Sequence, residues 1–254
     1  MTRDHRRRGV FRRVYPRGVG VFTSWLMRKK IIDTGFCIVD IPRTSCTSAR
    51  GELYARFGYP YGKAFRISGK INKKLQLGGH TEAVRLRQWL GPEAWRQIFT
   101  FSIVRNPWER YLSLYFWFIN NTHVHGISYF RDLHLRYTRE YGRGIPPPTS
   151  DVRKDFKHCL LTQYKSGYPW FSANKMLCDQ QGNLLVDFVV KFENRQEGLA
   201  HVGERIGFPE FGKSSKTNVS VEEYGYREYY DDELRDKVAE VSRWEIQRFD
   251  YSFD

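Results

Sequence analysis

The sequence predicts an α/β fold, with a single domain built around a central, mostly parallel sheet that is flanked by helices. Two observations carry this prediction. The apolar segments at 36–41 and 98–104 each have the composition of a short buried strand, and helix-start signals follow both directly. Strand-to-helix units of this kind form parallel sheets, whose ligands bind at the carboxyl edge. The chain has 254 residues, 41% of them hydrophobic, which is enough to bury one full core.

Residues 1–34 are expected to form a basic leader ahead of a domain spanning residues 35–254. The first thirty residues contain ten arginines or lysines and one acid, Asp4, so they carry +9 of the total net charge of +14. Because the excess is concentrated there, it does not describe the rest of the molecule. We favour a solvated arm, partly helical around residues 21–30, over attachment to nucleic acid or to an anionic membrane surface.

The cysteines and the hydropathy pattern bear on location. Four cysteines are widely spaced and form no C-x-x-C motif, which favours a reducing compartment over a disulfide framework or a metal site. No apolar run reaches the roughly 18 residues that a membrane span needs. The short apolar segment at 19–27 is not followed by the small-residue cleavage site of a signal peptide. We therefore expect a cytoplasmic protein, or one held peripherally at a membrane through the leader.

The first strand-to-helix unit has the layout of an anion-binding loop. Pro42 ends the strand, because proline cannot donate to a sheet ladder. Residues 43–48 are then a hydroxyl-rich turn, and a helix with Leu53 and Phe57 on one face follows. Backbone amides and the positive end of the helix dipole point at such a turn. The glycines and lysine of a Walker A loop are missing, and a simple capped helix after a strand is an equally good interpretation.

A histidine lies between the two units. Residues 59–79 are rich in glycine, lysine and aromatic residues and are predicted to form a loop. A helix over 81–90 follows, with Thr81 as its N-cap. His80 therefore stands at a loop-to-helix junction behind two glycines.

The second unit carries the clearest helix start in the chain. Asn106 is predicted as the N-cap, Pro107 occupies the first helical position and Glu109 completes a capping box. Arg105 then lies at the carboxyl end of the strand, and Ser113 lies two turns into the helix.

The second half of the chain is less informative. Residues 120–175 are predicted to be irregular, and we interpret His123 and His125 as surface histidines, because no acidic or thiol partner is near them in sequence. A hairpin turn at 178–183 is expected to lead into a strand at 184–192.

Two further segments close the chain. Residues 212–218 are predicted to form a polar loop that contains Lys213 and Lys216. Residues 231–249 have the apolar spacing of one amphipathic helix.

Taken together, these segments resemble the sulfotransferases that use 3′-phosphoadenosine 5′-phosphosulfate (PAPS), especially the carbohydrate-type and bacterial branch. Residues 41–48, Ile-Pro-Arg-Thr-Ser-Cys-Thr-Ser, are similar to that family's 5′-phosphosulfate loop. Residues 104–113, Val-Arg-Asn-Pro-Trp-Glu-Arg-Tyr-Leu-Ser, are similar to its 3′-phosphate motif. Gly79-His80 is similar in position to the catalytic histidine of uronyl 2-O-sulfotransferases. The likeness spans roughly residues 35–253, and both motifs occur in order.

The resemblance implies a site with a P-loop-like phosphosulfate cradle and no metal. His80 would be the general base toward the acceptor hydroxyl. Arg43 stands where the family usually has lysine, and we assign it charge stabilisation of the leaving phosphate, because arginine does not readily donate its proton. The implied nucleotide-binding residues are Arg43, Thr44, Ser45, Cys46, Thr47, Ser48, Arg105, Ser113, Lys213 and Lys216.

The leading hypothesis is in-line transfer of a sulfuryl group from PAPS to an acceptor hydroxyl of a carbohydrate or glycolipid. A tyrosyl-peptide sulfotransferase is the alternative within that class. A basic nucleic-acid-binding protein without catalysis is the alternative outside it, although no known nucleic-acid-binding motif accompanies the leader and no nucleic-acid partner is expected. A nucleotide kinase is a third possibility, but this chain lacks the lysine of the Walker A motif.

Overall fold

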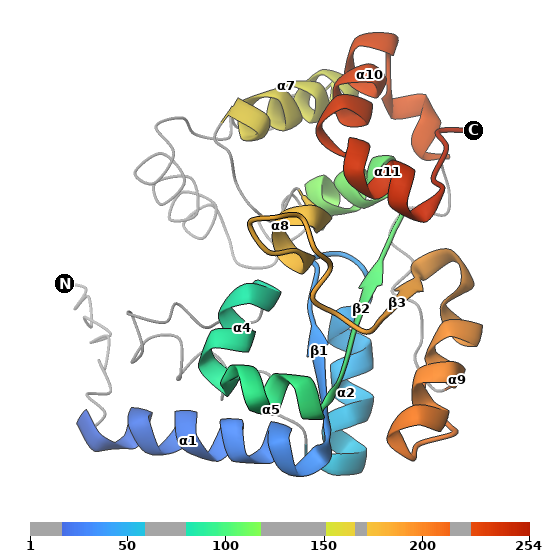
Figure 1. The fold of residues 1–254 in the computed structure, drawn as a ribbon. Coiled ribbons are helices and arrows are strands. Elements are labelled where there is room, and N and C mark those ends of the chain that lie inside the picture. The colour runs from blue at the N-terminus through green and yellow to red at the C-terminus, as the bar shows by residue number, and fades with distance from the viewer. Residues whose placement is uncertain (1–16, 59–79, 118–150, 166–171, 214–224) are drawn as a thin grey trace, which may run out of the picture.

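The computed structural model describes residues 17–58, 80–117, 151–165, 172–213 and 225–254. In these residues three parallel strands form one sheet in the order β1-β2-β3, with helices on both faces (Figure 1). The strands are β1 (Phe36–Val39), β2 (Phe99–Val104) and β3 (Phe188–Lys191). Phe36 is in register with Phe99, and Phe101 with Phe188. The predicted α/β fold is thereby confirmed.

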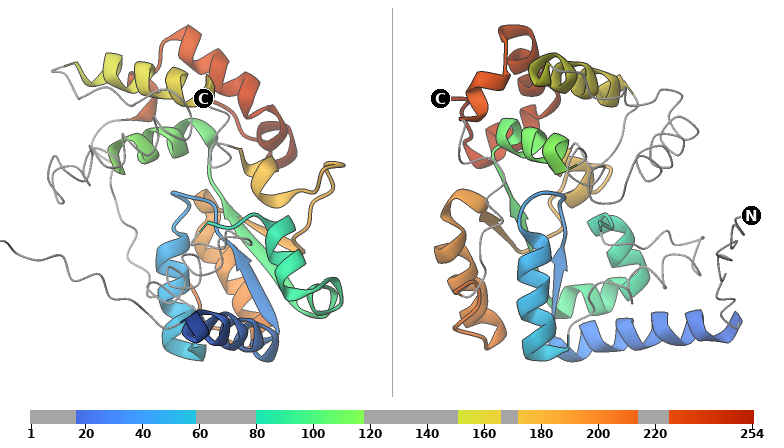
Figure 2. Two further views of the ribbon diagram at one scale, coloured as in Figure 1. Left: turned by 90° about the vertical axis from the view of Figure 1, so that its left-hand side faces the viewer. Right: turned by 180° about the vertical axis from the view of Figure 1, so that it is seen from behind.

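Two pairs of helices cover the sheet. Helices α2 (Cys46–Phe57) and α9 (Arg195–Ile206) lie on one face, and α4 (Ala83–Leu90) and α5 (Pro92–Gln97) lie on the other (Figure 2). Aromatic side chains fill the first of these layers, as in the edge-to-face contact of the buried Phe36 with the partly buried Phe57. Burying such apolar surface supplies most of the free energy that holds the layers together.

A second group of helices gathers beyond the end of the sheet toward which β2 points (Figure 1). It contains the helix at 107–117, α7 (Val152–Lys165), α8 (Ala173–Leu177), α10 (Asp232–Val241) and α11 (Arg243–Phe249). Two short 3₁₀ turns, η2 (Phe192–Asn194) and η3 (Tyr226–Tyr229), complete the described elements. Arg110 and Glu245 form an ion pair of 3.2 Å inside this group and are almost fully buried. This group of helices therefore lies at the carboxyl end of β2 and has a buried interior of its own.

The leader contains a helix that is attached to the domain. Helix α1 (Arg17–Thr34) runs across the amino end of the sheet (Figure 1). Met27 and Ile31 are buried, and the Arg28 guanidinium donates two hydrogen bonds to the Leu90 carbonyl, of 2.7 and 3.2 Å. Residues 27–34 thus pack on the domain instead of forming the solvated arm that we favoured. No described helix is both long and apolar enough to cross a membrane.

Several predicted elements need correction. Thr81 is buried and precedes the N-cap position of α4, which Glu82 occupies. The amphipathic segment at 231–249 forms two helices because the chain breaks at Ser242, whose hydroxyl lies 2.9 Å from the Tyr111 hydroxyl. Residues 120–175 are not wholly irregular, since they include α7 and the beginning of α8.

The third strand is shorter than the predicted segment at 184–192. Cys178 and Leu184 form an antiparallel bridge around the hairpin turn, which confirms the turn itself. Asp187 then accepts hydrogen bonds of 2.7 Å from the amide and the hydroxyl of Thr100, so regular pairing begins only at Phe188.

Candidate active site

The segment at 43–48 (loop 43–48) connects β1 to α2 in an unusual backbone conformation. The predicted turn is shorter than expected, because α2 already begins at Cys46 and only residues 43–45 of the segment precede the helix. Arg43 (φ 66°) and Ser45 (φ 64°) both lie in the left-handed region that favours glycine. The Thr44 hydroxyl donates to the Ile41 carbonyl at 2.9 Å and braces the turn from inside. No side chain in the described part of the chain caps the start of α2. The first amides of this helix therefore face the loop, an arrangement that suits an anionic ligand.

The loop touches the second strand-to-helix unit. The Arg43 Nε donates to the Ser113 hydroxyl at 3.2 Å, and the Arg105 Nη1 donates to the Arg43 carbonyl at 3.4 Å. Ser113 is fully buried. Burial and the nearby Arg105 charge lower the pKa of the Arg43 guanidinium. Because β1 and β2 are neighbours in the sheet, their carboxyl ends bring two arginines and a serine into one place.

Arg105 is held in position from two sides. Its Nη2 donates to the Glu109 carboxylate at 2.5 Å, and its guanidinium lies 4.2 Å from the centre of the Phe192 ring. A charge over an aromatic face and beside a carboxylate keeps little freedom of rotation. Arg105 thus presents its charge from a fixed point at the end of β2.

Asn106 confirms one helix signal and corrects another. Its side-chain oxygen accepts from the amides of Trp108 (3.1 Å) and Glu109 (3.5 Å), so it is the N-cap. The predicted capping box is wrong, because Glu109 is paired with Arg105 and the Asn106 amide donates to Glu193 Oε1 at 2.6 Å. The other Glu193 oxygen accepts from the Tyr251 hydroxyl at 3.1 Å. The end of β3 therefore anchors the helix start that follows β2.

His80 approaches the end of β1. Its Nδ1 lies 3.2 Å from the Asp40 carbonyl oxygen, which can only accept a hydrogen bond. We therefore assign the hydrogen to Nδ1, which leaves the lone pair on Nε2. Burial is the main cause that lowers the pKa of His80 to about 4, so the ring is neutral near pH 7.

Asp40 and Arg50 form a buried ion pair that the sequence did not reveal. Asp40 is 3% exposed and its carboxylate contacts the Arg50 guanidinium on α2. Burial raises the pKa of Asp40 to about 6, because its effect is larger than the lowering of the pKa by the Arg50 charge. The only signal in the sequence was that Asp40 interrupts the apolar segment at 36–41.

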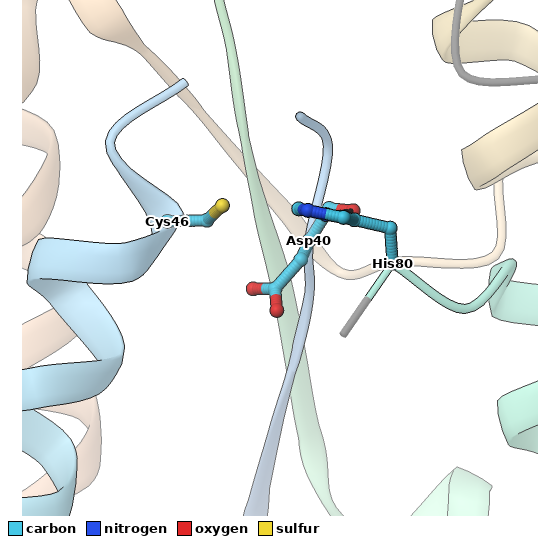
Figure 3. Close-up of side chains that lie close together, drawn as sticks. All are labelled: Asp40, Cys46 and His80. Carbon is cyan, nitrogen blue, oxygen red and sulfur yellow. Dashed lines mark hydrogen bonds between the residues drawn. The ribbon is translucent and has the colours of Figure 1, made fainter. Parts of the chain in front are cut away.

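Cys46 completes a small group with Asp40 and His80 (Figure 3). One ligand-type atom from each residue lies within 4.8 Å of the other two. Burial raises the pKa of the Cys46 thiol to about 12, so it stays protonated. All four cysteines are free thiols in the structure.

The structure says less about the remaining candidate residues. Within loop 43–48, Ser45 and Ser48 are half-buried and Thr47 is exposed. Lys213 is exposed and forms an ion pair of 3.0 Å with Glu210. Lys216, His123 and His125 lie outside the described residues.

Comparison with known proteins gives one match. A family model described as "Sulfotransferase family" matches residues 33–252, which is most of the chain. Searches among curated proteins and among solved structures found no match. The matched range includes both strand-to-helix units and the C-terminal segment beside Glu193.

Proposed function

The chain belongs to the sulfotransferase family, and from this premise we propose that it moves the sulfuryl group of PAPS to an acceptor hydroxyl. The observation that carries the proposal is the meeting of Arg43, Arg105 and Ser113 at two neighbouring strand ends. A nucleotide with a phosphate at each side of its ribose needs two anion sites close together. The two strand-to-helix units would supply them.

We assign one end of the nucleotide to each unit. Loop 43–48 and the first amides of α2 would hold the 5′-phosphosulfate, and Arg105 with Ser113 would hold the 3′-phosphate. Arg43 lies between them through its bond to Ser113. Lys213 and Lys216 are proposed to close over the bound nucleotide. Donors without a 3′-phosphate would lose the contacts to the second unit.

The reaction needs positioning and charge more than covalent chemistry from the protein. The acceptor oxygen would attack sulfur as the bond from sulfur to the bridging phosphate oxygen breaks, leaving negative charge on the 5′-phosphate. Arg43 and the amides of α2 would stabilise that charge. His80 Nε2 would take the proton of the acceptor hydroxyl. This scheme requires no metal.

For the acceptor we propose a carbohydrate or glycolipid hydroxyl. The proposal rests on the resemblance to the carbohydrate-type branch. We further propose a cytoplasmic protein whose basic leader can bring it to an anionic membrane surface, where a glycolipid acceptor would be found.

We expect His80→Ala to abolish sulfuryl transfer while the nucleotide still binds. A well-placed general base contributes about 10²–10⁴ in rate, and His80 does not belong to the two proposed phosphate sites. Transfer is measured with sulfur-labelled PAPS and a panel of glycans, lipids and peptides. Binding is measured by calorimetry with adenosine 3′,5′-bisphosphate, the product nucleotide.

His158→Ala is the matched control, because His158 is an exposed histidine on α7. It should leave both measurements unchanged. Near-normal transfer by His80→Ala would refute the assignment of the base. A wild-type protein that neither binds the bisphosphate nor transfers label would refute the proposed donor.

A further inference from the structure

Three side chains with metal-binding chemistry converge beside the start of α2. Asp40 follows β1, Cys46 is the first residue of α2 and His80 precedes α4. They offer a carboxylate oxygen, a sulfur and a ring nitrogen, and these atoms all lie within 4.8 Å of one another (Figure 3). Ligand atoms around one tetrahedral zinc ion lie roughly 1 Å closer together than this limit, so side-chain movements of about that size would bring all three to one ion.

An independent observation points to a missing partner. Asp40 is buried, and Arg50 contacts its Oδ2. Its Oδ1 has no hydrogen-bond partner among the described residues. A buried carboxylate oxygen without a partner is costly, and a cation bound to it removes that cost.

We propose that Asp40, Cys46 and His80 bind a zinc-type divalent ion and that the bound ion inhibits the enzyme. Sulfur, imidazole nitrogen and carboxylate oxygen are the ligands that Zn²⁺ takes in proteins, and three protein ligands leave a fourth position for water. With Cys46 as thiolate, two negative ligands cancel the charge of the ion. The neighbouring Arg43 and Arg50 would then face no net positive charge.

The surroundings supply the outer contacts of such a site. His80 gives Nδ1 to the Asp40 carbonyl and so turns Nε2 toward a ligand, and Arg50 supports the ligating carboxylate of Asp40. Metal-ligating histidines and carboxylates are usually held in these two ways. Binding of the ion displaces the thiol proton of Cys46, so one proton is released for each ion bound.

Inhibition follows from the shared histidine. The ion would bind the Nε2 lone pair that takes the proton of the acceptor hydroxyl in the proposed reaction. His80 could then not act as the base, so metal binding and turnover exclude each other. This part rests on the proposed function, whereas metal binding itself does not.

The binding test uses the full chain, freed of metal, and titrates it with Zn²⁺ by calorimetry and with Co²⁺ by absorption. A thiolate ligand gives Co²⁺ a charge-transfer band in the near ultraviolet. We expect one saturable site with this band. Cys46→Ser should abolish the band and weaken affinity by roughly tenfold or more, since even outer contacts are worth about 10–100-fold. Cys178→Ser, at another buried free cysteine, is the control and should retain both.

Asp40→Asn is the second variant, and circular dichroism checks that each variant is folded. Weaker Zn²⁺ binding by a folded Asp40→Asn protein supports the site. An absent band, or a band that Cys46→Ser retains, overturns it.

Inhibition is then tested on wild-type transfer activity. Zn²⁺ at saturation should stop transfer, and a chelator should restore it. A protein that binds Zn²⁺ at this site and still turns over normally would refute the inhibition and the role of His80 as base, while the metal site would stand. A protein that transfers sulfuryl groups but binds no Zn²⁺ would refute the metal site and leave the proposed function intact.

Discussion

The tautomer and the pKa of His80 depend on its surroundings in the fold. Its position behind two glycines at a helix start indicated a candidate base, and the sequence could go no further. Its tautomer depends on the Asp40 carbonyl, forty residues away in sequence, and its pKa depends mainly on burial. Asp40 and Arg50 escaped prediction for the same reason, because an ion pair between a strand end and a helix leaves no periodic pattern in the chain.

The pH dependence of transfer tests this description of His80. The base must be neutral to accept a proton, and burial sets its pKa at about 4 where an unperturbed histidine has about 6.5. Raising the pH through about 4 deprotonates His80 and turns activity on. We therefore expect the acid limb of kcat/KM that belongs to His80 to be centred near pH 4, below any limb near pH 6 that comes from protonation of Asp40.

The measurement is a pH–rate profile at saturating acceptor with varied PAPS. His158→Ala should give the same profile as the wild type. An acid limb centred near pH 6.5 that persists in Asp40→Asn would mean that the ring is solvated during the reaction, contrary to the structure.

At the scale of elements, prediction succeeded where a local pattern decides the structure. The strands β1 and β2 followed from their apolar runs, and Asn106 as N-cap followed from the side chain it offers to the amides of its helix. It failed where distant contacts decide. Ser242 breaks the last helix beside Tyr111, and Glu193 takes the contact expected of Glu109. Neither partner is near in sequence, so neither contact could be predicted from local spacing.

Glu193 gives a test at this scale. Its carboxylate joins the Asn106 amide to the Tyr251 hydroxyl and so fixes the turn that carries Arg105. Glu193→Gln removes the carboxylate charge and turns one accepting oxygen into an NH₂ group that can only donate, so at least one of the two charge-assisted hydrogen bonds is weakened or reversed. One hydrogen bond contributes about 0.5–1.5 kcal/mol, so we expect the affinity for adenosine 3′,5′-bisphosphate to fall by about two- to tenfold.

Calorimetry measures the affinity, and thermal unfolding checks that the fold is kept. Arg105→Ala should lose more affinity, because it removes the proposed contact itself. Glu197→Gln, at an exposed position in the first turn of α9, is the matched control and should bind normally. Unchanged affinity in Glu193→Gln would show that the turn holds its shape without this residue.

At the scale of the whole molecule, composition predicted a basic leader ahead of the domain, and residues 1–16 of that leader lie outside the described residues. Burial of Ile31 and the bonds from Arg28 to Leu90 attach the last part of α1 to the core. Charge counts could not show this, because they do not record which face of a helix meets the protein. The α/β class, by contrast, follows from the order of strands and helices alone, and it was predicted correctly.

Removing residues 1–16 tests the role of the leader without touching α1. The deletion takes away six arginines and Asp4. We expect binding of adenosine 3′,5′-bisphosphate to be unchanged and cosedimentation with anionic phosphatidylserine vesicles to fall sharply, because the attraction scales with the number of basic residues near the surface.

A variant with glutamine at the same six arginines separates charge from chain length and should behave like the deletion. Binding to short DNA and RNA duplexes is measured in parallel at two salt concentrations. Tight, salt-sensitive duplex binding that the deletion removes would favour the nucleic-acid alternative. Loss of nucleotide binding on deletion would show that the leader is part of the nucleotide site.

The left-handed conformations of Arg43 and Ser45 have a consequence for how this protein can change over time. Each of these two backbone conformations costs on the order of 1–3 kcal/mol, which favourable interactions elsewhere in the fold have to offset. Glycine at either position would relieve that cost and make the protein more heat-resistant, but it would also let the loop relax out of shape. Substitutions at these two positions that raise thermal stability would therefore weaken ligand binding. Under selection for thermal stability, we expect these two positions to change first.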